Sequence, residues 1–236
     1  MIKIALIDAD SLCYLGIEDI DIYKDRVDEL ISMMVAETKA SHYKVFIEAV
    51  GNQTFRKILY PEYKANRQDR ELPVNMMEIK HYIIDSLNPY VSVGVESDDS
   101  IISTYTYIKE EYPLTDVVIC AMDKDYKTFP VNIFDTYHAR FGELYSITEE
   151  QANKNFYIQM LMGDTSDNVK GIKGIGKVAS DKIITHSLAP FIACYREYVK
   201  AHKRKAKKEF IMSYTLLKLR KDCKKCYSFD EALFEN

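Results

Sequence analysis

The chain has 236 residues, which is enough for one large domain or two small ones with a buried core. Apolar residues make up 47% and charged residues 29% of it, as in an ordinary folded protein, and this excludes a disordered chain. No apolar run approaches the roughly 18 residues of a membrane span, and the N-terminal segment lacks the features of a signal peptide. Five cysteines without framework spacing fit a reducing compartment, so we expect a cytoplasmic protein.

The net charge of −4 is unevenly distributed. Residues 1–147 carry 15 Lys and Arg against 25 Asp and Glu, whereas residues 148–236 carry 17 against 11. An acidic half joined to a basic half indicates carboxylates around metal beside a surface that binds phosphate. Two ordinary solvated surfaces would give the same charges, so charge alone leaves both interpretations open.

The first 140 residues alternate between predicted strands and helices. Apolar, β-branched runs predict strands over 2–7, 43–50, 91–95, 117–122 and 131–134. Helical patterns lie between them, over 24–40, 75–87 and 97–111. This alternation predicts an α/β fold with a mostly parallel central sheet flanked by helices.

After about residue 141 the strand signals stop and helical patterns take over. We expect helices over 149–162, 177–186, 188–206 and 208–220, forming a small all-helical unit. The basic run 202–208 either extends a phosphate-binding surface or is a solvated helix face.

Acidic residues follow several predicted strands. Ligands of an open parallel sheet bind beyond the carboxyl ends of its strands, so these side chains are candidates for one shared site. They are Asp8, Asp10, Glu48, Glu96, Asp98, Asp99, Asp123 and Asp125. Oxygen-only ligands favour Mg²⁺ or Mn²⁺ over zinc, and two such ions suit phosphodiester hydrolysis.

The segment 163–177 is rich in glycine. Gly171, Gly174 and Gly176 permit a tight hairpin whose N–H groups face a phosphate at the start of a helix. Lys173 and Lys177 add charge without reading bases. Just upstream, acidic residues three apart at 164 and 167 would share one face of a helix end.

Several ordered motifs together resemble one family. They are IALIDADSL, TFRK followed by YPEYKANR, VESDD, MDKDY and GDTSDNVKGIKGIG. The chain resembles the 5′-nuclease (flap endonuclease) family, and especially its compact stand-alone bacteriophage members. The resemblance implies a PIN-like catalytic domain over 1–147 with a helical arch at about 52–88. It also implies a helix–three-turn–helix DNA-binding domain over 148–236.

The resemblance also implies roles for acidic residues. The first metal group comprises Asp8, Glu96, Asp98 and Asp99. The second comprises Asp123, Asp125, Asp164 and Asp167. Glu48 stands where relatives usually carry Asp and is a further expected ligand. Asp10 either supports a ligand or caps a helix.

The basic motif at the base of the arch is expected to contact the substrate. Lys64 would approach the scissile phosphate, and Arg67 would neutralise charge on it. Arg56 and Lys57 would hold the flanking backbone. Tyr60 and Tyr63 are available for base stacking.

The resemblance therefore implies a monomeric 5′-3′ exonuclease and flap endonuclease that acts in replication or repair. We expect it to use two Mg²⁺ ions, with Mn²⁺ as a substitute, and to bind K⁺ at the 169–176 hairpin. Its expected substrates are branched or nicked DNA and DNA/RNA hybrids, in the host cytoplasm if a phage encodes it. The alternatives are a PIN-type single-strand ribonuclease and a non-catalytic structure-specific DNA-binding protein. Zinc at the single Cys223–Cys226 pair is disfavoured.

Overall fold

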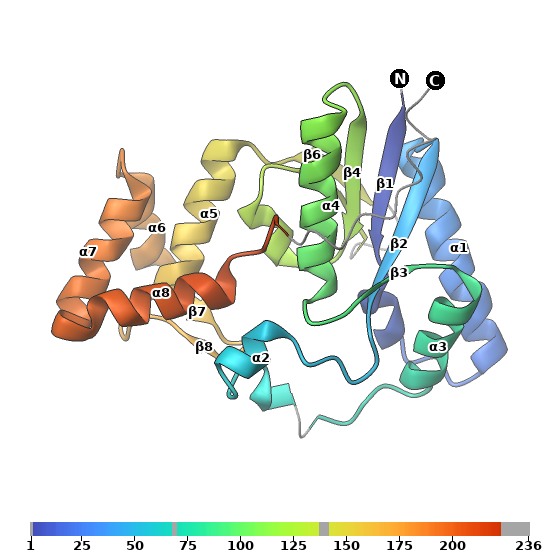
Figure 1. The fold of residues 1–236 in the computed structure, drawn as a ribbon, viewed down its shortest axis with the longest axis horizontal. Coiled ribbons are helices and arrows are strands. Elements are labelled where there is room, and N and C mark those ends of the chain that lie inside the picture. Colours follow the sequence, from blue (N-terminus) through green and yellow to red (C-terminus); the bar gives the residue numbers. More distant parts are fainter. Residues whose placement is uncertain (1, 68–69, 137–141, 223–236) are drawn as a thin grey trace.

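The computed structural model describes residues 2–67, 70–136 and 142–222 (Figure 1). The pair Cys223 and Cys226 lies outside the described residues. One sheet contains β1 (Lys3–Asp8), β2 (His42–Glu48), β3 (Tyr90–Ser92), β4 (Asp116–Ala121), β5 (Asn132–Asp135) and β6 (Glu143–Ser146). The helices are α1 (Ile20–Thr38), α2 (Phe55–Leu59), α3 (Met76–Ser86), α4 (Ser97–Glu111), α5 (Glu149–Met162), α6 (Lys177–Thr185), α7 (Pro190–His202) and α8 (Ala206–Leu217).

The sheet has the order β3-β2-β1-β4-β5-β6, and every pair is parallel except β5 and β6. Parallel strands place their carboxyl ends at one edge, so the ends of β1, β2 and β4 meet there. The predicted mostly parallel α/β sheet is therefore confirmed.

Two apolar cores cover the two faces of this sheet. Alternate residues of β1 point to opposite faces, as the period of a strand requires. Ala5 and Ile7 pack with α1 and α3, whereas Ile4 and Leu6 pack with α4. Figure 1 shows α4 in front of the sheet and α1 on its other side. The sheet is thus covered on both faces, which is why its strands read as continuous apolar runs.

Two short strand pairs depart from the expectation that strands end near residue 141. β6 pairs with β5 in antiparallel register, at the edge of the sheet. β7 (Gly163–Asp164) and β8 (Val169–Lys170) form a small hairpin after α5. The acidic residues at 164 and 167 therefore lie in a hairpin and its turn, and their prediction at a helix end is wrong. Helix α5 stops at Met162 because Gly163 takes a φ of +74°.

Helices α5–α8 form a third core beside the sheet, on the left in Figure 1. After α8 the chain returns to the sheet, where Leu219 joins the core beneath α4. The backbone N–H of Arg220 donates to Asp99 Oδ1 at 2.8 Å. This returning segment ties the helical region to the first turn of α4. None of the helices in the described residues has the length and hydrophobicity needed to cross a bilayer.

Candidate active site

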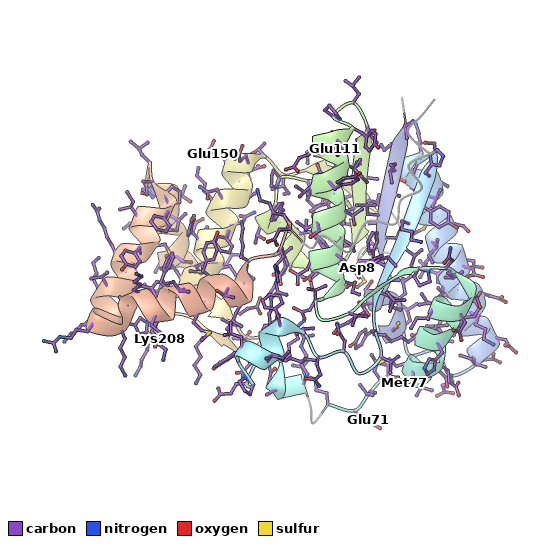
Figure 2. The ribbon with its side chains drawn as sticks, viewed as in Figure 1. Asp8, Glu71, Met77, Glu111, Glu150 and Lys208 are labelled. Carbon is purple, nitrogen blue, oxygen red and sulfur yellow. The ribbon has the colours of Figure 1, made fainter. Side chains whose placement is uncertain are left out.

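A cavity of about 530 Å³ lies at the carboxyl ends of β1, β2 and β4. Figure 2 shows Asp8 at this edge, at the end of β1. Five of the nine predicted metal ligands line the cavity: Asp8, Glu48, Glu96, Asp98 and Asp123. Lys64, Arg67, Lys80 and Lys124 line it as well. The strand ends thus bring together acidic residues that are up to 115 positions apart, with cations around them.

Asp8 is only 8% exposed, and hydroxyl groups hold it in place. Tyr126 donates to its Oδ2 at 2.8 Å, and Ser97 donates to its Oδ1 at 3.4 Å. Burial, together with the charges of Asp10 and Asp123, raises the pKa of Asp8 to about 7. A bound cation would remove this penalty, so the carboxylate fits a metal ligand.

The first turn of α4 carries the residues of the VESDD motif. Glu96 is the N-cap and Asp99 the third helical residue, and the two form a capping box. Carboxylate oxygens of Glu96, Asp98 and Asp99 lie within 4.8 Å of one another. Burial and the charges of Asp99 and Glu96 raise the pKa of Asp98 well above its usual range. The cluster therefore needs positive charge nearby.

Arg56 supplies part of that charge from inside the protein. Its Nη1 and Nη2 donate to the two carboxylate oxygens of Asp99 at 2.5 and 2.8 Å, and Nη1 also reaches Glu96 at 2.9 Å. The same guanidinium donates to the carbonyl groups of Leu216 and Lys218. Arg56 is 1% exposed. The expectation that it holds flanking DNA is wrong, because its donors are used within the core.

Asp99 is correspondingly shielded from the cavity. It is fully buried, and both of its oxygens accept hydrogen bonds from Arg56. It does not line the cavity with its neighbours. The structure thus places Asp99 behind the acidic residues, where it orients Arg56 and the returning segment.

Tyr63 and Lys64 connect the YKANR motif to two carboxylates. The Tyr63 hydroxyl lies 2.9 Å from Glu96 Oε2 and 2.7 Å from Asp167 Oδ2, and it has one proton to donate. The Lys64 ammonium contacts Glu96 and lies 3.9 Å from Asp167 Oδ1. Arg67 contacts the same Asp167 oxygen at 2.6 Å. Tyr63 is 4% exposed, so the expectation that it stacks on bases is wrong.

Opposing effects set the pKa of Glu96. Burial pushes this pKa up, but the ammonium of Lys64 and the guanidinium of Arg56 outweigh it and hold the pKa below its usual range. Glu96 is therefore an anion at neutral pH. For Asp167, burial prevails over Lys64 and raises the pKa.

Asp125 and Asp164 form a second group beside the cavity. Gln159 of α5 donates to both carboxylates, at 2.8 and 3.1 Å. Lys124 also reaches Asp164, at 2.8 Å. Burial, Asp123 and Asp164 raise the pKa of Asp125 to about 7. A helix of the C-terminal region thus helps to position two of the predicted ligands.

Glu48 and Asp10 lie at the end of β2 and just after β1. Glu48 Oε1 accepts from Asn52 at 3.1 Å, and burial raises its pKa, with Asp10 and Glu96 adding to the effect. Asp10 accepts from the backbone N–H of Glu48 at 2.9 Å and from Lys80 at 3.1 Å. Asp10 therefore supports a candidate ligand. It is not a helix cap, because the N-cap of the short helix Asp10–Tyr14 is Ala9.

The glycine-rich segment divides into a packed part and an open part. A Cβ at Gly171 would lie 2.0 Å from the carbonyl carbon of Met162, so this glycine allows close backbone packing. Its predicted contact with DNA is replaced by this packing role. Gly174, with a φ of +88°, and Gly176 have nothing within 4 Å of an added Cβ. Lys173 and Lys177 are exposed beside them, at the start of α6.

The sequence did not indicate four other residues at the site. Tyr126, Gln159, Lys80 and Lys124 have no repeated spacing relative to the acidic motifs. Lys124 and Tyr126 did have a local signal, because both lie in the MDKDY motif, whereas Lys80 and Gln159 had none. These residues reach the carboxylates through tertiary contacts.

The donor chemistry of the cavity fits hard divalent cations. Its anionic groups are carboxylates, which prefer Mg²⁺, Mn²⁺ or Ca²⁺ to softer metals.

A family model described as the N-terminal resolvase-like domain of 5′-3′ exonucleases matches residues 23–157. The chain belongs to the 5′-3′ exonuclease family.

Curated relatives of this 5′-3′ exonuclease family member include an exonuclease and DNA polymerases. DNA polymerase I of Bacillus subtilis (strain 168) is 26% identical over 209 residues, which cover 77% of this chain and 23% of that protein. The exonuclease of Escherichia phage T7 is 28% identical over 127 residues, covering 53% of this chain and 42% of that protein. The chain thus spans less than half the length of these relatives.

Solved structures of exonucleases share the fold. T5 5′-exonuclease with bound zinc ions has a TM-score of 0.62 at 17% identity, covering 92% of this chain and 100% of that one. T5 flap endonuclease in a complex with DNA and metal ions has a TM-score of 0.58 at 16% identity, covering 91% and 99%. At these identities the likeness shows the fold alone.

Proposed function

We propose that this chain is a structure-specific 5′-nuclease with 5′-3′ exonuclease and flap endonuclease activity. Its substrates are branched, nicked or RNA-primed DNA, and it serves replication or repair. The observation that carries the proposal is the acidic cavity at the strand ends, with Lys64 and Arg67 on its rim. The T5 flap endonuclease of similar fold was solved with DNA and metal ions, which supports this substrate class.

Two divalent ions, Mg²⁺ or Mn²⁺, are assigned to the carboxylates. Asp8, Glu48, Glu96 and Asp98 would hold the first, while Asp123, Asp125 and Asp164 would hold the second. Such ions supply an activated water and stabilise charge on the leaving oxygen. Tyr126 and Gln159 keep carboxylates in place, which supports a rigid ligand set.

Lys64 and Arg67 are assigned to the scissile phosphate. Both side chains reach the cavity from the segment after α2 and remain partly exposed, at 21% and 39%. An ammonium at the reacting phosphate stabilises charge that develops in the transition state. Asp167 contacts both cations and is therefore assigned to orient them rather than to bind metal.

The start of α6 is assigned to the duplex. Gly174 and Gly176 leave the backbone open, and the N–H groups of the first helical turn lack helical partners. Lys173 and Lys177 add cations for phosphates on either side of this turn. We assign residues 148–236 to this DNA-binding unit and residues 1–147 to the catalytic unit. We also propose that the protein acts as a monomer. K⁺ at the 169–176 hairpin stays a prediction, as does a DNA contact of Lys57.

The decisive experiment is cleavage of a labelled 5′-flap duplex with Mg²⁺ and then with EDTA. The proposal predicts metal-dependent cleavage near the junction and little cleavage of single-stranded RNA. Preferred cleavage of single-stranded RNA would favour a PIN-type ribonuclease. Tight binding of the flap without cleavage in Mg²⁺ would favour a non-catalytic binding protein.

The role of Lys64 is tested separately on the same substrate. Lys64→Ala should lower the single-turnover rate about a hundredfold, because one such contact lowers the barrier by about 2–4 kcal/mol. DNA affinity should change much less, since other phosphate contacts remain. A sharp loss of affinity at an unchanged saturated rate would reassign Lys64 to strand positioning.

A further inference from the structure

Of the three lysines that line the cavity, Lys64 and Lys80 contact different carboxylates. Lys64 contacts Glu96, which is assigned to the first ion, and Asp167. Lys80 of α3 contacts Asp10 at 3.1 Å, and Asp10 is outside the assigned ligands. The two ammonium groups thus neutralise different carboxylates of one site.

Glu96 depends on this neutralisation. It is 4% exposed, and its two oxygens are used by Lys64 on one side and by Arg56 and Tyr63 on the other. Arg56 is locked by backbone carbonyls, whereas the Lys64 side chain is 21% exposed. Among the described residues, Arg56 and Lys64 are the cations on Glu96, and of these only Lys64 has room to leave.

The backbone of Lys64 would stay in place if its side chain left. Its N–H donates to the carbonyl of Asp167 at 2.9 Å, and it takes a left-handed φ of 56°. The neighbouring Tyr63 is anchored in the core. A change of side-chain rotamers is therefore enough to move the ammonium between the carboxylates and the open cavity.

We infer that Lys64 is an exchangeable counterion of the metal site, paired with Glu96 without metal and released toward the substrate phosphate when a divalent ion is bound. The inference rests on the metal site proposed above. A divalent ion on the Glu96 oxygen that Lys64 contacts would repel the ammonium at contact distance, so Lys64 and the ion compete for that oxygen. Metal binding is thereby coupled to the release of the Lys64 ammonium, which can then contact the phosphate. Lys80 stays on Asp10 throughout.

The first test measures Mn²⁺ binding to the DNA-free protein by titration calorimetry. Lys64→Met removes the competitor and should tighten the first Mn²⁺ site tenfold or more. Lys57→Met is the matched control, because Lys57 lies in the same segment and hydrogen-bonds the carbonyl of Asn52; its effect should stay within twofold. Unchanged or weaker Mn²⁺ binding in Lys64→Met would overturn the inference.

The second test uses the wild-type protein and needs no variant to fold. Brief acetylation followed by mass spectrometry reports how reactive each lysine is. Mn²⁺ should raise the labelling of Lys64 fivefold or more and leave Lys80 within twofold. Equal or reduced labelling of Lys64 with Mn²⁺ would refute its release. A wild-type protein that binds no Mn²⁺ would instead refute the proposed metal site.

Discussion

Arg56 offers the sharpest test of how the site is built. The sequence motif suggests a DNA contact, whereas the structure buries the side chain between Asp99, Glu96 and the end of α8. Replacement by methionine keeps much of the volume and removes the guanidinium. Asp99, which is fully buried, then loses its cation, and two carbonyl groups lose a donor.

The expected loss of stability is large. Removing one partner of a buried ion pair costs about 3–5 kcal/mol, because the remaining charge stays desolvated. Exposure of 1% for Arg56 and 0% for Asp99 leaves no solvent to screen that charge. In a chain of this size each kcal/mol lowers Tm by roughly 2–4 °C, so Arg56→Met should lower it by roughly 6–20 °C.

Urea unfolding of the metal-free protein measures the effect. The pair Arg56→Met and Asp99→Asn provides the control, because the double variant should lose less stability than the two single losses combined. DNA affinity should fall little at temperatures where the variant remains folded. A loss below about 1 kcal/mol together with a clear drop in DNA affinity would refute the buried role and restore the DNA contact.

Three further predictions address the metals, the duplex and pH. Asp123→Asn should abolish cleavage while leaving the fold and DNA binding intact; near wild-type cleavage in Mg²⁺ would contradict the metal assignment. Changing Lys173 and Lys177 to Ala should weaken duplex binding equally for all sequences. The slope of log K against log salt concentration should also become shallower by about two, since each phosphate contact adds roughly 0.9. An unchanged slope in binding titrations would contradict the assignment of these lysines to the duplex. Without metal, stability should fall as pH rises from about 4 to about 7, because Asp8 and Asp125 have pKa values raised to about 7 and the folded state holds their protons longer than the unfolded one. Mg²⁺ should increase Tm more at pH 7.5 than at pH 5.5, and an equal increase at both would contradict the carboxylate assignment.

The helices that begin with strong local signals were predicted accurately. The predicted bounds of α4 and α5 match the observed Ser97–Glu111 and Glu149–Met162. Each begins with a capping box, and such hydrogen bonds join residues three positions apart. The parallel strands were also predicted from a local signal, because strands covered on both faces are apolar along their whole length.

The short antiparallel strands had no comparable signal. β6 is mostly exposed at the sheet edge, and β7 and β8 contain two residues each. Their identity as strands depends on a partner and not on their own composition. The same limit explains why a hairpin was mistaken for a helix end.

The sequence by itself determined the chemistry of this protein: carboxylates after the strands, cations in the YKANR motif and an open glycine turn before α6. Local patterns can place these groups because strand ends and helix starts are defined by neighbouring residues. Only the tertiary structure decided their partners. It turned Arg56 and Tyr63 inward, placed Asp99 behind the cavity and paired Lys64 with Glu96. Those pairings join residues 32 to 104 positions apart, and burial raises the cost of an unpaired charge, so the packed core selects which cation meets which carboxylate.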